Sequence, residues 1–291
     1  MDSERKRFRT FYTNKIHPAR AISNAKAETG LIFPPICAIL SGQILIGNTN
    51  MLLTIVTVTK NAAGTVAHAA ESLGHPLPDG VEYILKDAES SDGTSEVVRG
   101  IQPGAVVVQS PDRGIYDAMN QGWTRARGEY VMFLNADDRY LPGALEEMMR
   151  ELRANPDADI LHGCIRVNGR KYRPAQGLAS FHGARIFHPA SAIRRSLLDR
   201  LGGFDYQWKI CADLDFFLRA KESGATFLFV DREITDFALG GVSTVRRKDT
   251  ASEVRHILLA RGFGHIFADG YYLAARLRAC ASHAVKIIKG S

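Results

Sequence analysis

Two adjacent carboxylates, Asp137 and Asp138, follow two residues after Glu129–Leu134, an apolar run of strand-forming residues. Such a strand end can supply a metal and phosphate site, because crevices of parallel sheets lie outside the carboxyl ends of their strands. Mg²⁺ or Mn²⁺ is typically held by one or two carboxylates together with substrate phosphates. The two acids can equally cap the N-terminus of the helix that Pro142 predicts, so these residues alone leave both interpretations open.

Further aspartates fall at comparable places along the chain. Asp87 ends a second predicted strand, Asp112 and Asp117 follow a third, and Asp213 and Asp215 open a later helix. Clustered anionic groups repel a bare phosphate, so phosphate binding there requires Mn²⁺ or Mg²⁺. The sequence has no zinc-like Cys/His spacing, no G-x-G-x-x-G after the first strand and no P-loop. Dinucleotide-binding and P-loop enzymes are therefore excluded.

The elements that must position these acids alternate between strand and helix from Met51 onward. This alternation predicts right-handed βαβ crossovers and an α/β fold with a mostly parallel central sheet flanked by helices. Strands are expected at 52–59, 81–85, 105–109 and 129–134, with helices at 62–73, 95–99, 115–127 and 144–153. A more mixed half follows, with a hairpin of 160–167 and 171–173, strands at 186–193, 226–230 and 234–237, and helices at 196–201 and 212–223.

The two ends of the chain differ in composition from its middle. Residues 1–30 carry seven Lys/Arg against three Asp/Glu, and 243–291 carry nine against three, which leaves 21 basic and 25 acidic residues between them. The net charge of +6 therefore resides in the ends, and this distribution argues against a nucleic-acid-binding face. We expect 1–50 to be a disordered, dispensable extension, 51–246 to form one domain and 247–291 to form a helical tail.

The tail has the pattern of a basic amphipathic helix over 252–289. Its apolar stripe recurs at alternating spacings of four and three residues, and its basic residues lie off the stripe. Such a helix can contact a membrane surface peripherally, or it can pack against the domain, and the pattern leaves both open. The apolar residues of the stripe are Ile266, Leu273, Leu277, Cys280, Ala284 and Ile287, with Gly270 between the first two.

Cysteine usage and hydropathy point to a cytoplasmic protein, with the inner face of the membrane as an alternative place of action. Four dispersed cysteines are typical of reduced thiols. The apolar run Leu31–Gly47 contains Pro34-Pro35 and is shorter than the roughly 20 residues that a membrane span needs. We therefore predict no transmembrane helix.

Seven segments between Met51 and about Arg246, taken in order and spacing, resemble a family 2 glycosyltransferase with the GT-A fold. The third of them is particularly similar to enzymes of exopolysaccharide, colanic-acid-type and glycolipid assembly. The segments are Ile55–Asn61, Asp87–Thr94, Pro111–Gly122, Phe133–Asp138, His188–Ser191, Leu201–Asp205 and Ala212–Asp215.

The resemblance implies a nucleotide-sugar donor and a role for each matching residue. Asn135-Ala136-Asp137 stands for the DXD motif, so that Asp137, aided by Asp138, would hold Mn²⁺ or Mg²⁺ on the diphosphate, and Asp213 would be the general base. Asn135 replaces the first acid of that motif, and Ala88 replaces a frequent glycine after Asp87. The residues implied to bind the nucleotide sugar are Thr57, Thr59, Asp87, Asp117 and Asp137.

The implied chemistry is a single displacement with inversion at the anomeric carbon. One carboxylate makes the acceptor hydroxyl nucleophilic, and a metal relieves the charge on the departing nucleoside diphosphate. Arg113 could reach phosphate, and His188 and Trp208 could face the acceptor, although a surface arginine, a structural histidine and a core tryptophan are comparable alternatives. Gly240–Thr244 could close over the donor.

We expect a UDP-sugar donor, with GDP next, and a saccharide or lipid-linked acceptor in cell-surface polysaccharide or glycolipid biosynthesis. A sugar-phosphate nucleotidyltransferase is the first alternative, but Thr59–Thr65 lacks the Gly-rich basic loop that it would need. A non-catalytic nucleotide-sugar-binding protein is the second, and it conflicts with the presence of Asp87, Asp137 and Asp213. The sugar, the acceptor and the oligomeric state are left open.

Overall fold

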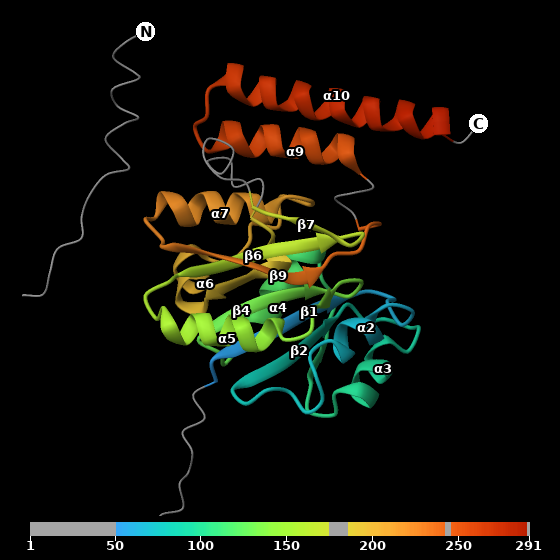
Figure 1. Cartoon of the computed structure of the whole chain (residues 1–291), viewed down its shortest axis with the longest axis vertical. Coiled ribbons are helices and arrows are strands. Elements are labelled where there is room, and N and C mark those ends of the chain that lie inside the picture. The colour runs from blue at the N-terminus through green and yellow to red at the C-terminus, as the bar shows by residue number, and fades with distance from the viewer. Residues whose placement is uncertain (1–50, 175–185, 242–245, 290–291) are drawn as a thin grey trace, which may run out of the picture. The chain divides into compact units, whose positions relative to one another are not determined.

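The computed structural model describes residues 51–174, 186–241 and 246–289 (Figure 1). The predicted extension 1–50, the apolar run Leu31–Gly47 and part of the Gly240–Thr244 loop lie outside the described residues. Within the described residues, nine strands form one sheet in the order β3-β2-β1-β4-β8-β6-β9-β5, with β7 paired to β6.

One half of the sheet is parallel, as predicted. The strand β1 (Leu53–Thr59) lies between β2 (Val81–Asp87) and β4 (Tyr130–Asn135), and β3 (Val106–Gln109) pairs with β2. Because β1 pairs on one side with β2 and on the other with β4, the chain changes direction across the sheet at β1. The crevice at such a switch point is where open α/β sheets bind ligands. The register sets Thr59 beside Asp87 and Val58 beside Asn135.

The other half of the sheet is mixed. The strand β8 (Ser191–Arg194) runs antiparallel to both β4 and β6 (Ile160–Val167), while β9 (Phe227–Asp236) runs parallel to β6 with a shift in register near Gly163. A side chain at Gly163 would meet the carbonyl oxygen of Arg232 at 2.9 Å, so this close approach requires glycine. The edges are completed by β7 (Arg170–Tyr172) and β5 (Arg139–Tyr140).

Helices cover both faces of the sheet and make two cores. The core on one face joins buried side chains of α2 (Val66–Glu71), α3 (Thr94–Ile101) and α5 (Ala144–Ala154) to the sheet. The core on the other face uses α4 (Ile115–Trp123), α6 (Arg195–Leu201) and α7 (Ala212–Glu222). In β1, Ile55 enters the first core and Val56 the second, as expected for a strand buried on both faces.

Several predicted elements differ at their ends or in number. The helix expected at 62–73 is reduced to α2, and the strand expected from 186 begins at β8, because Pro189 lies in a short 3₁₀ turn, η2 (His188–Ala190). The strands expected at 226–230 and 234–237 are one strand, β9, with the bulge between them. The two-residue strand β5 was not predicted, because its length gives no periodic signal.

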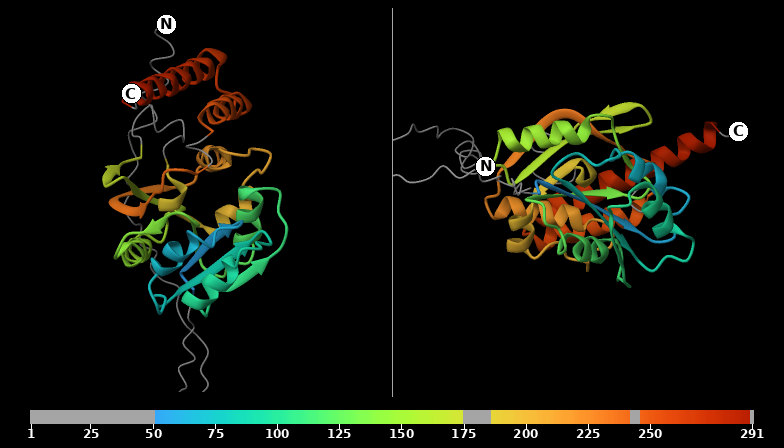
Figure 2. Two further views of the ribbon diagram at one scale, coloured as in Figure 1. Left: turned by 90° about the vertical axis from the view of Figure 1, so that its right-hand side faces the viewer. Right: turned by 90° about the horizontal axis from the view of Figure 1, so that it is seen from below.

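The tail is two helices and not one. The helix α9 (Arg247–Ala260) lies between α7 and α10 (His265–Lys289) (Figure 1 and Figure 2). A short turn that contains Gly262 and Gly264 separates α9 from α10. A third apolar cluster joins these three helices. Among the helices that the structure describes, none is long and apolar enough to cross a bilayer.

The apolar stripe predicted on the tail faces away from the domain along the first half of α10. Ile266 is 94% exposed, and Leu273 and Leu277 are 59% and 61% exposed, whereas Ala268 on the opposite side is buried in the third cluster. The helix therefore packs through a face other than this stripe. The later stripe residues Cys280, Ala284 and Ile287 have side chains outside the described set.

Candidate active site

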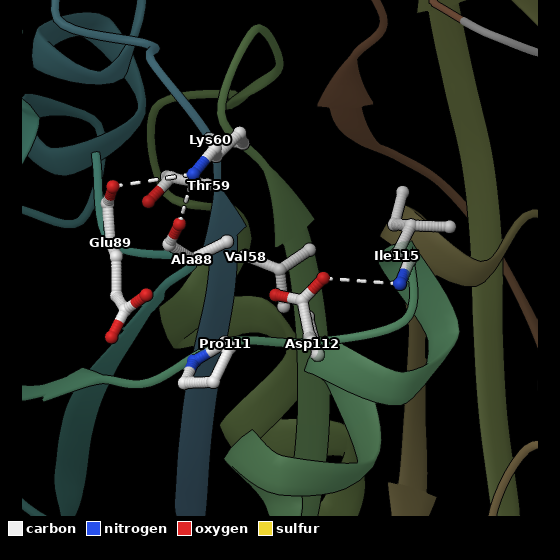
Figure 3. Close-up of a pocket in the computed structure, with 10 residues that line it drawn as sticks. Val58, Thr59, Lys60, Ala88, Glu89, Pro111, Asp112 and Ile115 are labelled. Carbon is white, nitrogen blue, oxygen red and sulfur yellow. Dashed lines mark hydrogen bonds between the residues drawn. The ribbon is translucent and has the colours of Figure 1, made fainter. Parts of the chain in front are cut away.

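A cleft of about 450 Å³ opens at the carboxyl ends of β1 and β2 (Figure 3). Lys60 spans its rim by donating from Nζ to the carbonyl oxygens of Ala88, at 2.5 Å, and Glu89, at 3.2 Å. Glu89 has a φ of 55°, in the left-handed region, which fixes the turn of this loop. The lining residues are Val58, Thr59, Lys60, Ala88, Glu89, Pro111, Asp112, Gly114, Ile115 and Ala118.

Asp87 is buried beside this cleft and does not line it. Its two oxygens accept hydrogen bonds from Thr59, Ser90, Ser95 and Gln109. Burial opposes ionisation, but these donors outweigh it and lower the pKa of the Asp87 carboxyl. With its acceptor sites filled in this way, Asp87 holds the 88–90 loop in place.

Thr57, the other threonine predicted to line the nucleotide pocket, lies inside the sheet. It is buried on β1, it is not among the residues that line the cleft, and its hydroxyl has no hydrogen-bond partner among the described residues. Thr59, two residues on, is the one predicted nucleotide-binding threonine that lines the cleft.

The loop before α4 is held by a buried lysine that the sequence analysis did not single out. Lys86 at the end of β2 is buried, and its ammonium group donates to Asp112 Oδ2 at 2.9 Å and to the carbonyl oxygen of Ser110 at 2.8 Å. A lysine inside an apolar strand pattern was the available signal, because a buried cation requires an anionic partner.

Asp117 and Arg113 bind each other at the start of α4. Asp117 Oδ2 accepts the backbone N–H of Arg113 at 2.9 Å, and Oδ1 accepts from the Arg113 guanidinium at 2.8 Å, so Asp117 stabilises the helix start. The hydrogen bond from Arg113 lowers the pKa of Asp117. The guanidinium also stacks on Tyr206, with 3.8 Å between its carbon and the ring centre, yet the Arg113 side chain is 62% exposed.

The two acids at the end of β4 have contrasting surroundings. Asp137 is exposed, whereas Asp138 is buried, accepts the Ala238 N–H at 2.8 Å and accepts from Asn135 Nδ2 at 2.7 Å. Burial raises the pKa of Asp138 to about 7. Asp138 thus anchors the segment after β9, and within the described part of the chain no group of three or more His, Cys, Asp or Glu side chains forms a metal cage.

Asp213 lies at the centre of a polar chain that reaches from α7 to the end of β4. Its Oδ2 lies 3.1 Å from His188 Nδ1, and its Oδ1 accepts from the Tyr116 hydroxyl at 3.1 Å. The other ring nitrogen of His188 lies 3.4 Å from Asn135 Oδ1. The chain Asp138–Asn135–His188–Asp213–Tyr116 therefore joins two acids, Asp138 and Asp213, that are 75 positions apart in the sequence.

Asn120 was not selected from the sequence, yet it connects two of the matching segments. Its side chain makes two hydrogen bonds with the Phe204 backbone, at 2.7 and 2.9 Å. A Cβ on Gly203 would lie 2.4 Å from Asn120 Oδ1, and the φ of Gly203 is +67°, so this contact requires glycine. Asn120 thereby ties α4 to the loop that leads to α7.

Trp208 is partly buried between two apolar clusters and does not stand out as a surface platform. Its indole N–H is buried and finds no acceptor within 51–174, 186–241 and 246–289. The structure thus places Trp208 within the loop before α7, where its side chain packs against both apolar clusters.

The family model for glycosyl transferase family 2 matches residues 54–208, which is more than half of the chain. The chain belongs to this family. It is therefore a transferase, and the predicted family resemblance is confirmed. Asp213 lies just beyond the matched stretch.

Curated relatives with similar sequences carry the same enzyme class. A PGL/p-HBAD biosynthesis glycosyltransferase of Mycobacterium tuberculosis is 25% identical over 182 residues, covering 60% of this chain and 71% of its own. An uncharacterized glycosyltransferase of Bacillus subtilis is 29% identical over 187 residues, covering 59% and 69%.

Solved structures confirm the GT-A fold. The Staphylococcus aureus TarS fragment 1–349 in complex with UDP-GlcNAc has a TM-score of 0.59 at 18% identity, covering 76% of this chain and 70% of its own. The mannosyltransferase PcManGT from Pyrobaculum calidifontis, in complex with GDP-Man and Mn²⁺, has a TM-score of 0.58 at 20% identity, covering 82% and 79%.

Proposed function

We propose that this glycosyltransferase moves a sugar from a nucleotide-sugar donor, with UDP favoured over GDP, to an acceptor hydroxyl by one displacement with inversion. The observation that carries this proposal is the placement of Asp213, held by His188 and Tyr116 and linked through His188 and Asn135 to Asp138 at the end of β4. The donors named with the two structural neighbours support the substrate class.

Asp213 is the proposed general base. Its side chain is 24% exposed, so an acceptor hydroxyl can reach the carboxylate and give up its proton there. His188, which contacts Oδ2, and Tyr116, whose hydroxyl proton is shared between Oδ1 and the Ile210 carbonyl oxygen, hold the carboxylate in one orientation. Fixed orientation matters because the oxygen of the acceptor must meet the anomeric carbon from the side opposite the leaving diphosphate.

The residues at the end of β4 fit a metal that is bound jointly with substrate. Asp137 is the exposed carboxylate there, and Mg²⁺ or Mn²⁺ needs only one or two carboxylates when phosphate oxygens supply further ligands. The oxygens of Asp138 are already hydrogen-bonded, so we assign metal binding to Asp137 and loop anchoring to Asp138. When bound, the metal acts as a Lewis acid that stabilises the departing diphosphate.

The cleft at β1 and β2 is the proposed nucleoside site. Thr59 lines it, Asp87 shapes its 88–90 loop, and Asp117 orients Arg113. Arg113 keeps an exposed guanidinium and directly precedes Gly114, which lines the cleft, so we assign it to the phosphates of the donor. His188 and Trp208 belong to the acceptor side, with Trp208 acting through the packing of the loop before α7.

We propose that α10 brings the enzyme to the cytoplasmic face of an anionic membrane, where a lipid-linked or saccharide acceptor of polysaccharide or glycolipid assembly is available. The exposed stripe Ile266, Leu273 and Leu277 offers apolar area to the bilayer. Residues 265–289 hold four Lys/Arg and a single acid, Asp269, which is paired with Arg255. This charge favours anionic lipid headgroups over a second copy of the same basic helix.

A donor panel tests the transferase proposal. Thermal shifts with UDP, GDP and their sugar conjugates, each with and without Mn²⁺, should give a metal-dependent shift for one nucleotide. Product analysis with membrane extracts should then show an inverted glycosidic linkage. Absence of any shift with nucleoside diphosphate and metal refutes nucleotide-sugar use. Formation of a nucleotide sugar from sugar phosphate would support a nucleotidyltransferase, and donor binding without turnover would support a non-catalytic protein.

Vesicle sedimentation tests the membrane proposal. The full chain should sediment with vesicles that contain anionic lipid and not with neutral ones, and Leu273→Glu with Leu277→Glu should abolish sedimentation. Tyr172→Glu, at an exposed side chain on β7, is the matched control and should sediment normally. Sedimentation unchanged in the α10 double variant would refute this contact.

A further inference from the structure

The segment that leads into the helix carrying Asp213 is held by a side chain from a different helix. The residue before α7, Cys211, makes no side-chain cap of its own. Instead, the carboxylate of Glu253 on α9 accepts three consecutive backbone N–H groups, from Lys209, Ile210 at 2.7 Å and Cys211 at 2.9 Å. Three successive N–H groups that converge on one anion form a rigid nest.

The same short segment is held from its other side by α4. The hydroxyl of Tyr116 contacts the carbonyl oxygen of Ile210 at 2.8 Å and Asp213 Oδ1 at 3.1 Å. The segment 209–211 is therefore fixed between Tyr116 and Glu253, and Asp213 follows it by two residues. Any rotation of this segment would displace the Asp213 carboxylate from His188.

Glu253 is itself held in place, because α9 is docked on α7 by apolar and ionic contacts. Leu214 and Leu218 of α7 share an apolar cluster with Val254, Ile257 and Leu258 of α9. At the end of α9, Arg261 donates to Asp215 at 2.9 Å, and Asp215 is fully buried. A docked helix provides a fixed position from which a carboxylate can orient a neighbouring segment.

We infer that Glu253 is a positioning residue for the general base, so that α9 is a working part of the active site and not only a connection to α10. This inference rests on the proposed role of Asp213 as base. It assigns a catalytic contribution to residues well beyond 54–208, the stretch matched by the family model.

The expected signature is a loss of turnover without a loss of donor binding. Displacement of a reacting group by about 1 Å can cost on the order of 100-fold in rate. The nucleoside cleft lies at the ends of β1 and β2, and Glu253 is not among its lining residues. Glu253→Ala should therefore lower kcat about 10- to 100-fold while leaving the KM for the donor and the donor-induced thermal shift unchanged.

Two further variants make the test selective. Glu253→Gln keeps one carbonyl oxygen for the nest, so it should recover part of the lost kcat. Asp269→Asn is the matched control, because it breaks an ion pair between α9 and α10, Arg255 with Asp269, and leaves 209–211 untouched. It should keep wild-type kcat.

A double-mutant cycle separates this inference from the role of Asp213. If Glu253 acts through the base, Glu253→Ala should have almost no effect on the residual rate of Asp213→Asn. Full multiplication of the two effects, wild-type kcat in Glu253→Ala, or a parallel loss of donor binding and Tm would each overturn the inference. If Asp213→Asn itself keeps normal turnover, the proposed base is wrong and the inference fails with it. If Glu253→Ala does not fold, Glu253→Gln is used in the cycle.

Discussion

The two halves of the sheet use their carboxylates differently. In the parallel half, the carboxylate oxygens of Asp87 and Asp117 accept hydrogen bonds from residues of the adjoining loops and helices. In the mixed half, Asp213 keeps an accessible carboxylate, and side chains from α4 and η2 restrain it from outside. The acids of the first half thus hold the loops around the cleft, while Asp213 in the second half remains accessible and is the proposed general base. At the junction between the halves, Asp138 is buried and hydrogen-bonded, whereas the adjacent Asp137 is exposed and is the proposed metal ligand.

The largest expected effect tests the reactive acid. Asp213→Asn should lower kcat by about 10²–10⁴-fold, because the amide cannot take the proton of the acceptor hydroxyl. Donor-induced thermal shift and Tm should stay near wild type, since Tyr116 and His188 still find an isosteric side chain. Steady-state kinetics and calorimetry check this, and a variant that keeps most of its turnover would remove Asp213 from the role.

Two variants at the end of β4 test whether Asp137 binds the metal and Asp138 does not. Asp137→Asn should lower kcat by roughly 10²–10³-fold and abolish the Mn²⁺ dependence of nucleotide binding, as expected for loss of electrostatic stabilisation of the leaving group. Asp138→Asn should keep Mn²⁺-dependent binding, measured by titration calorimetry. Equal loss of Mn²⁺ affinity in both variants would show that the two acids share the metal.

Asp87→Ala tests whether the buried acids of the parallel half stabilise the fold. Asp87→Ala should lower the free energy of unfolding by about 3 kcal/mol, because Ser90, Ser95 and Gln109 lose a buried charged acceptor. Urea denaturation measures this change. Ser91→Ala, at an exposed side chain, is the control and should have little effect on the free energy of unfolding. An Asp87→Ala variant that keeps normal stability but loses nucleotide binding would instead show that Asp87 binds the nucleotide base of the donor.

A smaller effect is expected at His162, a buried residue of β6 whose Nδ1 finds no partner among the described residues. Burial lowers its pKa to about 4 from an ordinary value near 6.5. The unfolded chain therefore binds the proton more readily between these values, so the stability is fully present above about pH 6.5 and falls as the pH drops toward 4.

The corresponding variant is His162→Phe, which suits neighbours Phe227 and Phe229. The wild type should lose about 2 kcal/mol more than this variant between pH 7.5 and pH 5, from the linkage between the two pKa values. Urea denaturation at both pH values checks it. Identical pH dependence in the two proteins would show that His162 does not contribute.

Sequence patterns predicted the parallel half well, because its strands are continuous apolar runs and its connections are regular helices. The mixed half was less predictable. The start of the strand expected at 186–193 is a 3₁₀ turn that contains Pro189. The two strands expected at 226–230 and 234–237 are the single strand β9, which pairs with β6 through a bulge near Gly163. Such features depend on pairing between strands that are distant in the sequence, and local periodicity carries no information about that pairing.

For the site, the sequence by itself determined the family motifs and the apolar stripe of α10, and it singled out Asp137 and Asp213 as candidates. Only the tertiary structure decided which acids are free to act, because hydrogen-bond saturation depends on donors that come from other elements. Asp87 and Asp138 are buried and hydrogen-bonded in this way, and Glu253, the proposed positioning residue, contacts the segment before α7 from a helix that no motif marks. The sequence lists the charged groups, and the fold decides which of them remain available for chemistry.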